Sequence, residues 1–267
     1  MTAPEAEQFG LSWIPRNVPR VALVTGGARR IGRALVEMLA AQGMAVAIHC
    51  HRSWPEAQAL LAELEHRGGR GCVVQADLGE EEALLPMMAQ VREKLGAIGV
   101  LVNNASVFRR DEFSTVTRHS WDQHMEPNLR APFVLSQELE RHLPSGAEGL
   151  ILNMLDQRVW NLTPHFVSYT VARSALWSLT QSMALGFAPR IRVNAIGPGP
   201  VLPALGQSEA QFEAMCAKTP LQRPASPEEI ARAALMLFSL PSVTGQMLAL
   251  DSGQHLNWGY VPPADSA

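Results

Sequence analysis

Cysteine and lysine are both scarce in this sequence. The three cysteines, Cys50, Cys72 and Cys216, are far apart and form no CxxC pair. This number and spacing argue against a disulfide framework or a zinc site and favour a reducing compartment. The eight histidines show no metal-ligand spacing, so we expect no metal centre. Of the 22 basic residues, Lys94 and Lys218 are the only lysines.

Charge and long apolar runs are also limited. Charged residues make up 18% of the 267 residues, against ~25% in a typical chain, and the formal net charge is −3. Such a balance gives no reason to expect nucleic acid or a membrane surface as a partner. Residues 1–10 lack the apolar segment of a signal peptide. The longest uncharged helical stretch, residues 174–189, falls short of the ~20 apolar residues of a membrane span. We therefore expect a cytoplasmic protein.

What the chain does contain is a regular alternation of short apolar runs and longer amphipathic ones. We predict strands over Val21–Thr25, Ala45–His49, Gly71–Gln75, Val100–Asn103, Leu150–Asn153, Arg192–Ala195 and Met247–Leu250. We predict helices over Arg30–Gln42, Pro55–Arg67, Glu80–Leu95, Ser120–Leu143, Pro164–Phe187 and Pro227–Ser239. Pro86 is expected to kink the third helix, and Pro127 and Pro132 are expected to break the fourth. Alternation of this kind predicts an α/β fold: a single Rossmann-type, doubly wound parallel sheet of about seven strands with helices on both faces.

No linker divides the chain, so one domain is expected over residues 19–258, between tails at 1–18 and 259–267. Two irregular stretches, Phe108–His119 and Ile196–Gln222, follow the fourth and sixth strands. Open α/β sheets bind ligands at the carboxyl ends of their strands. We therefore expect both stretches to face a ligand, with a substrate loop at about 197–222.

A glycine-rich turn follows the first strand. The segment Thr25-Gly26-Gly27-Ala28-Arg29-Arg30-Ile31-Gly32 leads directly into a predicted helix. Glycines in this context permit a tight turn and let a pyrophosphate approach the positive end of the helix. The strand–turn–helix order predicts a dinucleotide site.

The end of the second strand indicates which dinucleotide binds. An NAD site has a carboxylate near this place, whereas the chain reads His49-Cys50-His51-Arg52-Ser53. Arg52 can grip a 2′-phosphate through its planar guanidinium, and Ser53 adds a hydroxyl donor. The segment therefore favours NADP over NAD.

Two further segments have residue types that are typical of a cofactor site, and one pair of residues could supply an acid. Asp77-Leu78 and Asn103-Asn104-Ala105-Ser106 follow successive strands and are candidates for cofactor loops. Tyr169 and Arg173 are four residues apart on one predicted helix, so they share a face. A cation one turn from a phenol is expected to lower the pKa of that phenol and make it a better acid.

In this order, the motifs resemble those of the short-chain dehydrogenases/reductases over about residues 19–257. The matching segments are TGGARRIG (25–32), Asp77-Leu78, NNAS (103–106), Asn128, YTVAR (169–173), the loop 197–200 and VTGQMLALDSG (243–253). The chain is most similar to the pteridine reductase branch, which includes dihydromonapterin reductases. Arg30 replaces a glycine as in that branch, HCHRSWPEAQAL (49–60) resembles its NADPH-specific segment, Asp156 replaces a serine, and Phe108 matches its substrate-stacking aromatic residue.

The resemblance implies a role for each of these residues. Cofactor contacts are implied for Gly26, Arg30, Ile31, Gly32, His51, Arg52, Ser53, Asp77, Leu78, Asn104, Ala105, Ser106, Tyr169, Arg173, Pro198 and Gly199. Asp156 and Tyr169 are implied as the catalytic pair, assisted by Arg173 and by Asn128, which orders a water. Phe108, Asp156 and Tyr169 are implied to contact the substrate. A homo-oligomer, with a tetramer favoured, is also expected.

The implied activity is an NADPH-dependent reduction of a pteridine-type substrate, such as a dihydropterin, dihydromonapterin or dihydrofolate. Arg173 departs from the family, which has lysine four residues after the tyrosine. Two alternatives stay open. One is a carbonyl reductase of another small molecule, and the other, suggested by Arg173, is a weakly active protein that binds NADP or a pterin.

Overall fold

The structure, a computed structural model, describes residues 13–204 and 206–256. Within them, one parallel sheet has the strand order β3-β2-β1-β4-β5-β6-β7. The strands are β1 (Val21–Val24), β2 (Ala45–Cys50), β3 (Gly71–Gln75), β4 (Val100–Asn103), β5 (Gly149–Met154), β6 (Ile191–Pro198) and β7 (Met247–Leu250). The direction of winding reverses between β1 and β4, and the carboxyl edge of the sheet at this reversal is where such folds bind ligands.

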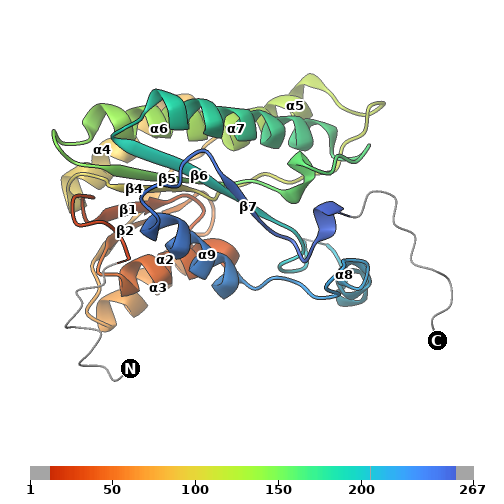
Figure 1. Ribbon diagram of the computed structural model, residues 1–267, viewed down its shortest axis with the longest axis horizontal. Helices are drawn as coiled ribbons and strands as arrows, with labels where there is room; N and C mark the ends of the chain where they lie inside the picture. The colour runs from red at the N-terminus through yellow and green to blue at the C-terminus, as the bar shows by residue number, and fades with distance from the viewer. Residues whose placement is uncertain (1–12, 205, 257–267) are drawn as a thin grey trace.

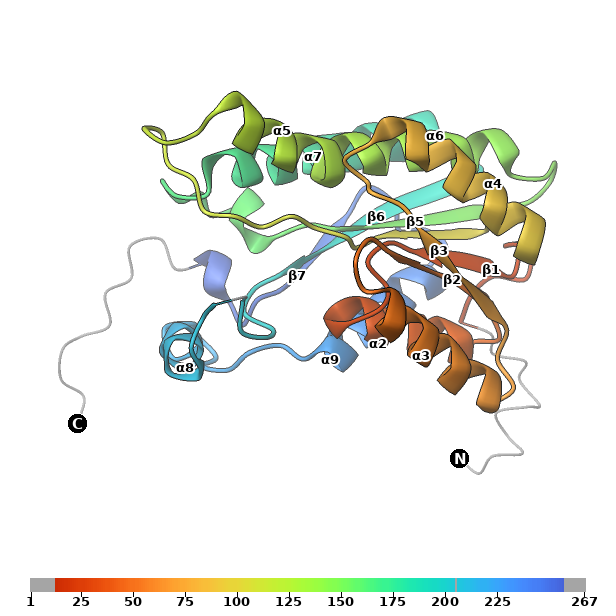
Figure 2. The same ribbon diagram turned by 180° about the vertical axis from the view of Figure 1, so that it is seen from behind.

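Helices cover both faces of the sheet. One face carries α2 (Arg30–Ala41), α3 (Trp54–His66) and α9 (Pro227–Ser239) (Figure 1). The other carries α4 (Leu84–Leu95), α5 (Arg118–Met125), α6 (Ala131–His142) and α7 (Val167–Gly186), as the reverse view shows (Figure 2). The short helix α8 (Glu209–Cys216) lies beyond the end of the sheet. The predicted doubly wound α/β fold is confirmed.

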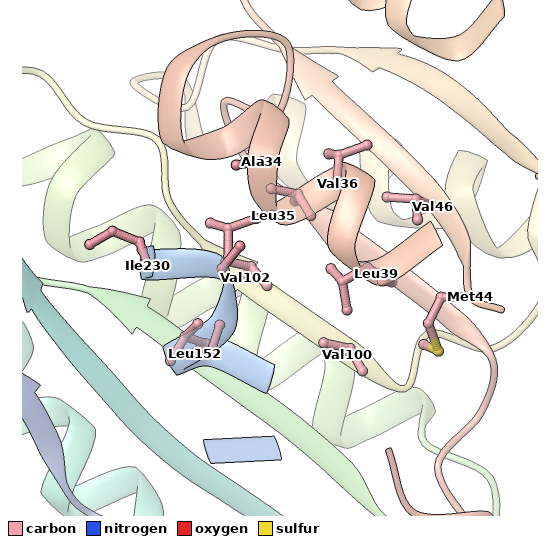
Figure 3. Close-up of a cluster of buried hydrophobic side chains, with 14 of the residues drawn as sticks. Ala34, Leu35, Val36, Leu39, Met44, Val46, Val100, Val102, Leu152 and Ile230 are labelled. Carbon is pink, nitrogen blue, oxygen red and sulfur yellow. The ribbon is translucent and has the colours of Figure 1, made fainter. Parts of the chain in front are cut away.

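The strands hold the helices through apolar contact on both faces. All four residues of β1 are buried, which explains why its sequence is apolar at every position. Leu35 and Leu39 of α2 have no exposed surface, and they belong to one buried cluster with Val102 of β4 and Ile230 of α9 (Figure 3). Burying each such side chain contributes ~1.5–3 kcal/mol, so this layer holds α2 firmly where the glycine turn enters it.

The structure corrects the predicted break in the fourth helix. Residues 118–142 form a continuous helical segment, in which a π-helical stretch, Glu126–Arg130, joins α5 to α6. Pro127 lies within the stretch and Pro132 at the start of α6. A π turn widens the helix, which accommodates a proline ring and its missing N–H without ending the helix.

Several other predicted boundaries also differ from the structure. Ile14 and Val18, placed in the N-terminal tail, are buried in the core, so the packed chain begins earlier than residue 19. The first turn of the third predicted helix is a 3₁₀ turn, Glu81–Ala83. Helix α8 lies in the stretch predicted to be irregular, where Ser208 caps it by accepting a hydrogen bond from the Gln211 backbone N–H. The predicted tail at 259–267 lies outside the described residues.

In the part of the chain that the structure describes, no helix is long and apolar enough to cross a membrane. In the same residues, no group of three or more His, Cys, Asp or Glu side chains is placed to hold a metal ion.

Candidate active site

The glycine turn is tight, as its sequence predicted. Gly26 has a φ of +61°, a left-handed conformation that glycine adopts without strain. A Cβ atom on Gly32 would collide with the carbonyl oxygen of Gly26, so the turn and α2 can approach only without a side chain there. Arg29, the N-cap of α2, makes no side-chain capping bond, so it leaves the first backbone N–H groups of the helix uncapped.

His49 holds this turn from β2. Its Nδ1 accepts a hydrogen bond from the Gly26 N–H at 3.0 Å, and its Nε2 lies 3.1 Å from the carbonyl oxygen of Ala76. The neutral tautomer with a proton on Nε2 satisfies both contacts. The ring is 2% exposed, and this burial lowers the pKa of His49 to about 4. His49 was not a predicted site residue, although a histidine near the end of an otherwise apolar strand is a signal that could have identified it.

Asn104 holds the turn from the other side. Its Nδ2 donates to the carbonyl oxygens of Thr25 and Gly26 at 2.9 and 3.1 Å. The Thr25 hydroxyl in turn accepts from the backbone N–H groups of Asn104 and Ala105 at 2.9 and 3.0 Å. The segment after β4 therefore shapes the turn through these hydrogen bonds.

A cleft of about 820 Å³ opens beside the turn. Twelve of the predicted cofactor residues line it, namely Gly26, Arg30, Ile31, Gly32, His51, Arg52, Ser53, Asp77, Leu78, Asn104, Ala105 and Ser106. Arg52 is exposed, and the Ser53 hydroxyl makes no capping bond to α3, so both can reach a ligand. No carboxylate stands at the end of β2, and the cleft residues fit a dinucleotide with a 2′-phosphate.

Arg30 also contacts the segment after β6. Its guanidinium donates to the carbonyl oxygens of Leu202 and Pro203 at 3.2 and 3.0 Å. Pro198 and Gly199, predicted as cofactor contacts, do not line the cleft. Gly199 has a packing requirement, since a Cβ atom there would lie 2.7 Å from Cα of Asp251. Cofactor contact by Pro198 and Gly199 stays a prediction.

Asp156 and Tyr169, implied by the resemblance as the catalytic pair, contact each other outside the cleft. The Tyr169 hydroxyl donates to Oδ2 of Asp156 at 3.0 Å. The same carboxylate accepts two bonds from Arg158: the backbone N–H reaches Oδ1 at 2.9 Å, and Nη1 reaches Oδ2 at 3.1 Å. Arg158 was not among the predicted site residues. Its guanidinium makes Asp156 the centre of a three-residue polar cluster.

Arg173 lies on the far side of the tyrosine. It is 2% exposed, with its guanidinium carbon 5.4 Å from the centre of the Tyr169 ring. Its Nε and Nη1 atoms are buried without a hydrogen-bond partner among the described residues. Buried donors of this kind suit a ligand with hydroxyl acceptors, such as the ribose of a dinucleotide.

The expected lowering of the Tyr169 pKa is wrong in its net direction. Burial raises the pKa of Tyr169, and the nearby Asp156 carboxylate raises it further. Arg173 does lower this pKa, as predicted, but its effect is smaller than that of burial. Tyr169 therefore keeps its proton at neutral pH.

Phe108 lies against Tyr169, in an aromatic cluster that only the folded chain reveals. Its ring stacks on Phe166, with centroids 4.5 Å apart and an interplanar angle of 4°. The Tyr169 ring meets Phe108 edge-on at 4.7 Å. The guanidinium carbon of Arg158 lies 5.3 Å from the Phe108 centroid and 5.1 Å from that of Phe166. Phe108 is 40% exposed, so the aromatic pair opens to solvent beside the acid cluster.

Asn128 supports Phe108 through the backbone of its neighbour. The buried side chain accepts from the Val107 N–H at 2.9 Å and donates to the Val107 carbonyl oxygen at 2.8 Å. The water-ordering role implied for Asn128 stays a prediction.

A family model described as enoyl-(acyl carrier protein) reductase matches residues 26–255. A short-chain dehydrogenase/reductase of Armillaria gallica is 32% identical over 248 residues, covering 88% of this chain and 95% of that protein. The chain belongs to the short-chain dehydrogenase/reductase family.

Two further proteins similar to this chain are named for different substrates. The crystal structure of FolM alternative dihydrofolate reductase 1 from Brucella canis, complexed with NADP, matches with a TM-score of 0.89 and 43% identity, covering 94% of this chain and all of that one. A 3-oxoacyl-[acyl-carrier-protein] reductase of Synechocystis sp. is 29% identical over 238 residues, 88% of this chain and 96% of that protein. The NADP in the Brucella structure agrees with the cofactor predicted from Arg52 and Ser53.

Proposed function

We propose that this short-chain dehydrogenase/reductase is an NADPH-dependent reductase of a pteridine-type substrate, such as a dihydropterin, dihydromonapterin or dihydrofolate. The contact between the Asp156 carboxylate and the Tyr169 hydroxyl, beside the exposed Phe108 ring, carries this proposal. A flat heterocycle can stack on an aromatic ring, and a nitrogen heterocycle suits a site with a carboxylate in place of serine.

The cofactor fits the residues that the structure brings together. Arg52 and Ser53 would hold the 2′-phosphate, and the unpartnered donors of Arg173 would hold ribose hydroxyls. NADPH, when bound, supplies the hydride. The chain's own task is to orient the substrate and to hold a proton for it.

Tyr169 holds that proton at its hydroxyl oxygen. Because burial raises the pKa of Tyr169, the phenol is protonated at neutral pH and acts as a donor rather than as a base. Its O–H points to Asp156 and can turn to a substrate nitrogen placed within reach. Arg158 keeps Asp156 in place through two hydrogen bonds. A phenol that is protonated at neutral pH is ready for the reductive direction, in which the substrate takes up a proton.

A carbonyl reductase is the second candidate, because the Synechocystis relative is named for a 3-oxoacyl substrate. An NADPH oxidation assay separates the two functions. The purified protein is tested against dihydrobiopterin, dihydromonapterin, dihydrofolate, a 3-oxoacyl thioester and simple ketones, with Tyr169→Phe as the inactive control. We expect turnover of at least one dihydropterin or of dihydrofolate. Turnover of ketones or the thioester alone would replace the pteridine proposal with the carbonyl one.

The assembly and location follow as part of the same proposal. We infer a homotetramer in the cytoplasm, supported by the family resemblance and by exposed apolar side chains on α7, where Val171 and Leu185 are 40% and 83% exposed. Light scattering coupled to size-exclusion chromatography tests the assembly, and a monomer would contradict it.

A further inference from the structure

A buried chain of three polar side chains joins two segments of the active site. The Ser168 hydroxyl donates to Oδ2 of Asp111 and lies 2.6 Å from Nδ1 of His124. Asp111, Ser168 and His124 are 5%, 0% and 1% exposed. The Ser168 backbone N–H also donates to Oδ1 of Asp111 at 3.2 Å. The name Asp–Ser–His chain is used below for these three residues.

The hydrogen bonds of the Asp–Ser–His chain all point the same way, from the Arg109 N–H toward the Asp111 carboxylate. Nε2 of His124 accepts the Arg109 backbone N–H at 3.1 Å. Burial lowers the pKa of His124, which keeps the ring neutral near pH 7. Because Nε2 accepts a hydrogen bond, the single ring proton lies on Nδ1. His124 therefore donates to Ser168, and Ser168 donates to Asp111. Each side chain between the Arg109 N–H and the Asp111 carboxylate has a partner.

The Asp–Ser–His chain ends beside the rings of Phe108 and Phe166. Arg109, which His124 holds, directly follows Phe108. The Asp111 carbonyl oxygen accepts the Phe166 N–H at 2.9 Å. Ser168 lies on α7 between Phe166 and the catalytic Tyr169. With Asn128 holding the residue before Phe108, the loop after β4 is fixed on both sides of the exposed ring.

Burial of the Asp111 carboxylate is costly for a purely structural contact. Among the described residues, its side chain accepts hydrogen bonds only from Ser168. Buried polar networks that are fully satisfied make their surroundings rigid and select one arrangement. Here the arrangement selected is the parallel stack of Phe108 on Phe166 beside Tyr169.

We propose that the Asp–Ser–His chain is a positioning device that sets the specificity of the site for flat heteroaromatic substrates, by holding Phe108 and Phe166 stacked beside Tyr169. The substrate class named here rests on the proposed function. The three residues act through the aromatic pair, and none of them lines the cleft.

Ser168→Ala tests the proposal, because it removes the central link and leaves the charge of the site unchanged. Ser136→Ala is the matched control: Ser136 is also fully buried, and its hydroxyl donates to the Pro132 carbonyl oxygen at 2.6 Å within α6. We expect Ser168→Ala to raise the KM for a dihydropterin about tenfold, with kcat and the NADP Kd changed by less than about threefold. Ser136→Ala is expected to lower Tm by a similar amount and to leave that KM unchanged. Equal KM changes in the two variants would overturn the proposal.

A second measurement needs no substrate. Protein labelled with 4-fluorophenylalanine gives ¹⁹F signals for Phe108 and Phe166, assigned from Phe108→Leu and Phe166→Leu. We expect both signals to shift or broaden in Ser168→Ala, and in Asp111→Asn if the alanine variant does not fold, but not in Ser136→Ala. Unchanged signals would overturn the positioning role. If the parent protein turns over no pteridine, the proposed function fails, while this measurement still decides whether the chain holds the aromatic pair.

Discussion

The buried His49 side chain must be neutral to accept the hydrogen bond that holds the glycine turn. Nδ1 accepts the Gly26 N–H, so a proton added there would face another proton and break the contact. Burial lowers the pKa of His49 to about 4, whereas an unfolded histidine titrates near ~6.5. Acid is therefore expected to weaken the folded state at this residue.

The sign and size follow from linkage. Between pH ~6.5 and ~4 the unfolded chain binds more protons at this residue than the folded one, so the free energy of unfolding falls as the pH falls. The contribution of His49 is fully present above pH ~6.5 and is lost as the pH approaches and passes ~4. For these two pKa values the loss is ~2 kcal/mol between pH 7 and pH 5, and ~3 kcal/mol in full.

The assay is urea unfolding of the parent and of His49→Gln at pH 7 and pH 5, without cofactor. Glutamine does not titrate, and the difference between the two proteins cancels the contribution of every other acid and base. We expect the stability advantage of the parent to shrink by ~2 kcal/mol at pH 5. His66→Gln, at an exposed histidine of α3, is the control and should follow the parent. If the parent and His49→Gln lose the same stability over this range, the reasoning about His49 is refuted.

Three other predictions concern the active site. Arg52→Ala should reduce the preference for NADP over NAD by about tenfold or more, because it removes a charge-assisted hydrogen bond of ~1.5–3 kcal/mol. Calorimetry with both cofactors checks this prediction, and equal binding of NADP and NAD by the parent protein would contradict it. Phe108→Ala should raise the KM for the pteridine substrate and leave NADPH affinity nearly intact, since stacking contributes ~0.5–1.5 kcal/mol beyond burial. If the affinity for the cofactor falls as much as that for the substrate, the role of Phe108 is structural. Arg173→Lys should retain or raise kcat, since either cation can bond the ribose and lie over the Tyr169 ring. Restoration of activity to an inactive parent by this change would favour the weakly active binding protein, and loss of activity would give the arginine a dedicated role.

Local pattern determined the fold class and most of the cofactor cleft. A strand that is buried on both faces must be apolar throughout, so Val21–Val24 was visible as β1 before any partner was known. Gly26 and Gly32 lie where only glycine fits, and that steric requirement is written in the sequence itself. Arg52 and Ser53 followed from the absence of a carboxylate near the end of β2. These features depend on neighbours that are close along the chain.

The structure alone decided what depends on neighbours that are far apart along the chain. The periodicity of α7 assigns residues to a face of the helix, but it does not name the residue that meets that face. The sequence therefore did not predict that the Phe166 ring stacks on Phe108. Nor did it predict that Asp111 and His124 both contact Ser168. The pKa of Tyr169 was misjudged for the same reason. The sequence displays the cation one turn away, whereas the larger effect, removal of the phenol from water, arises only when distant segments close around it.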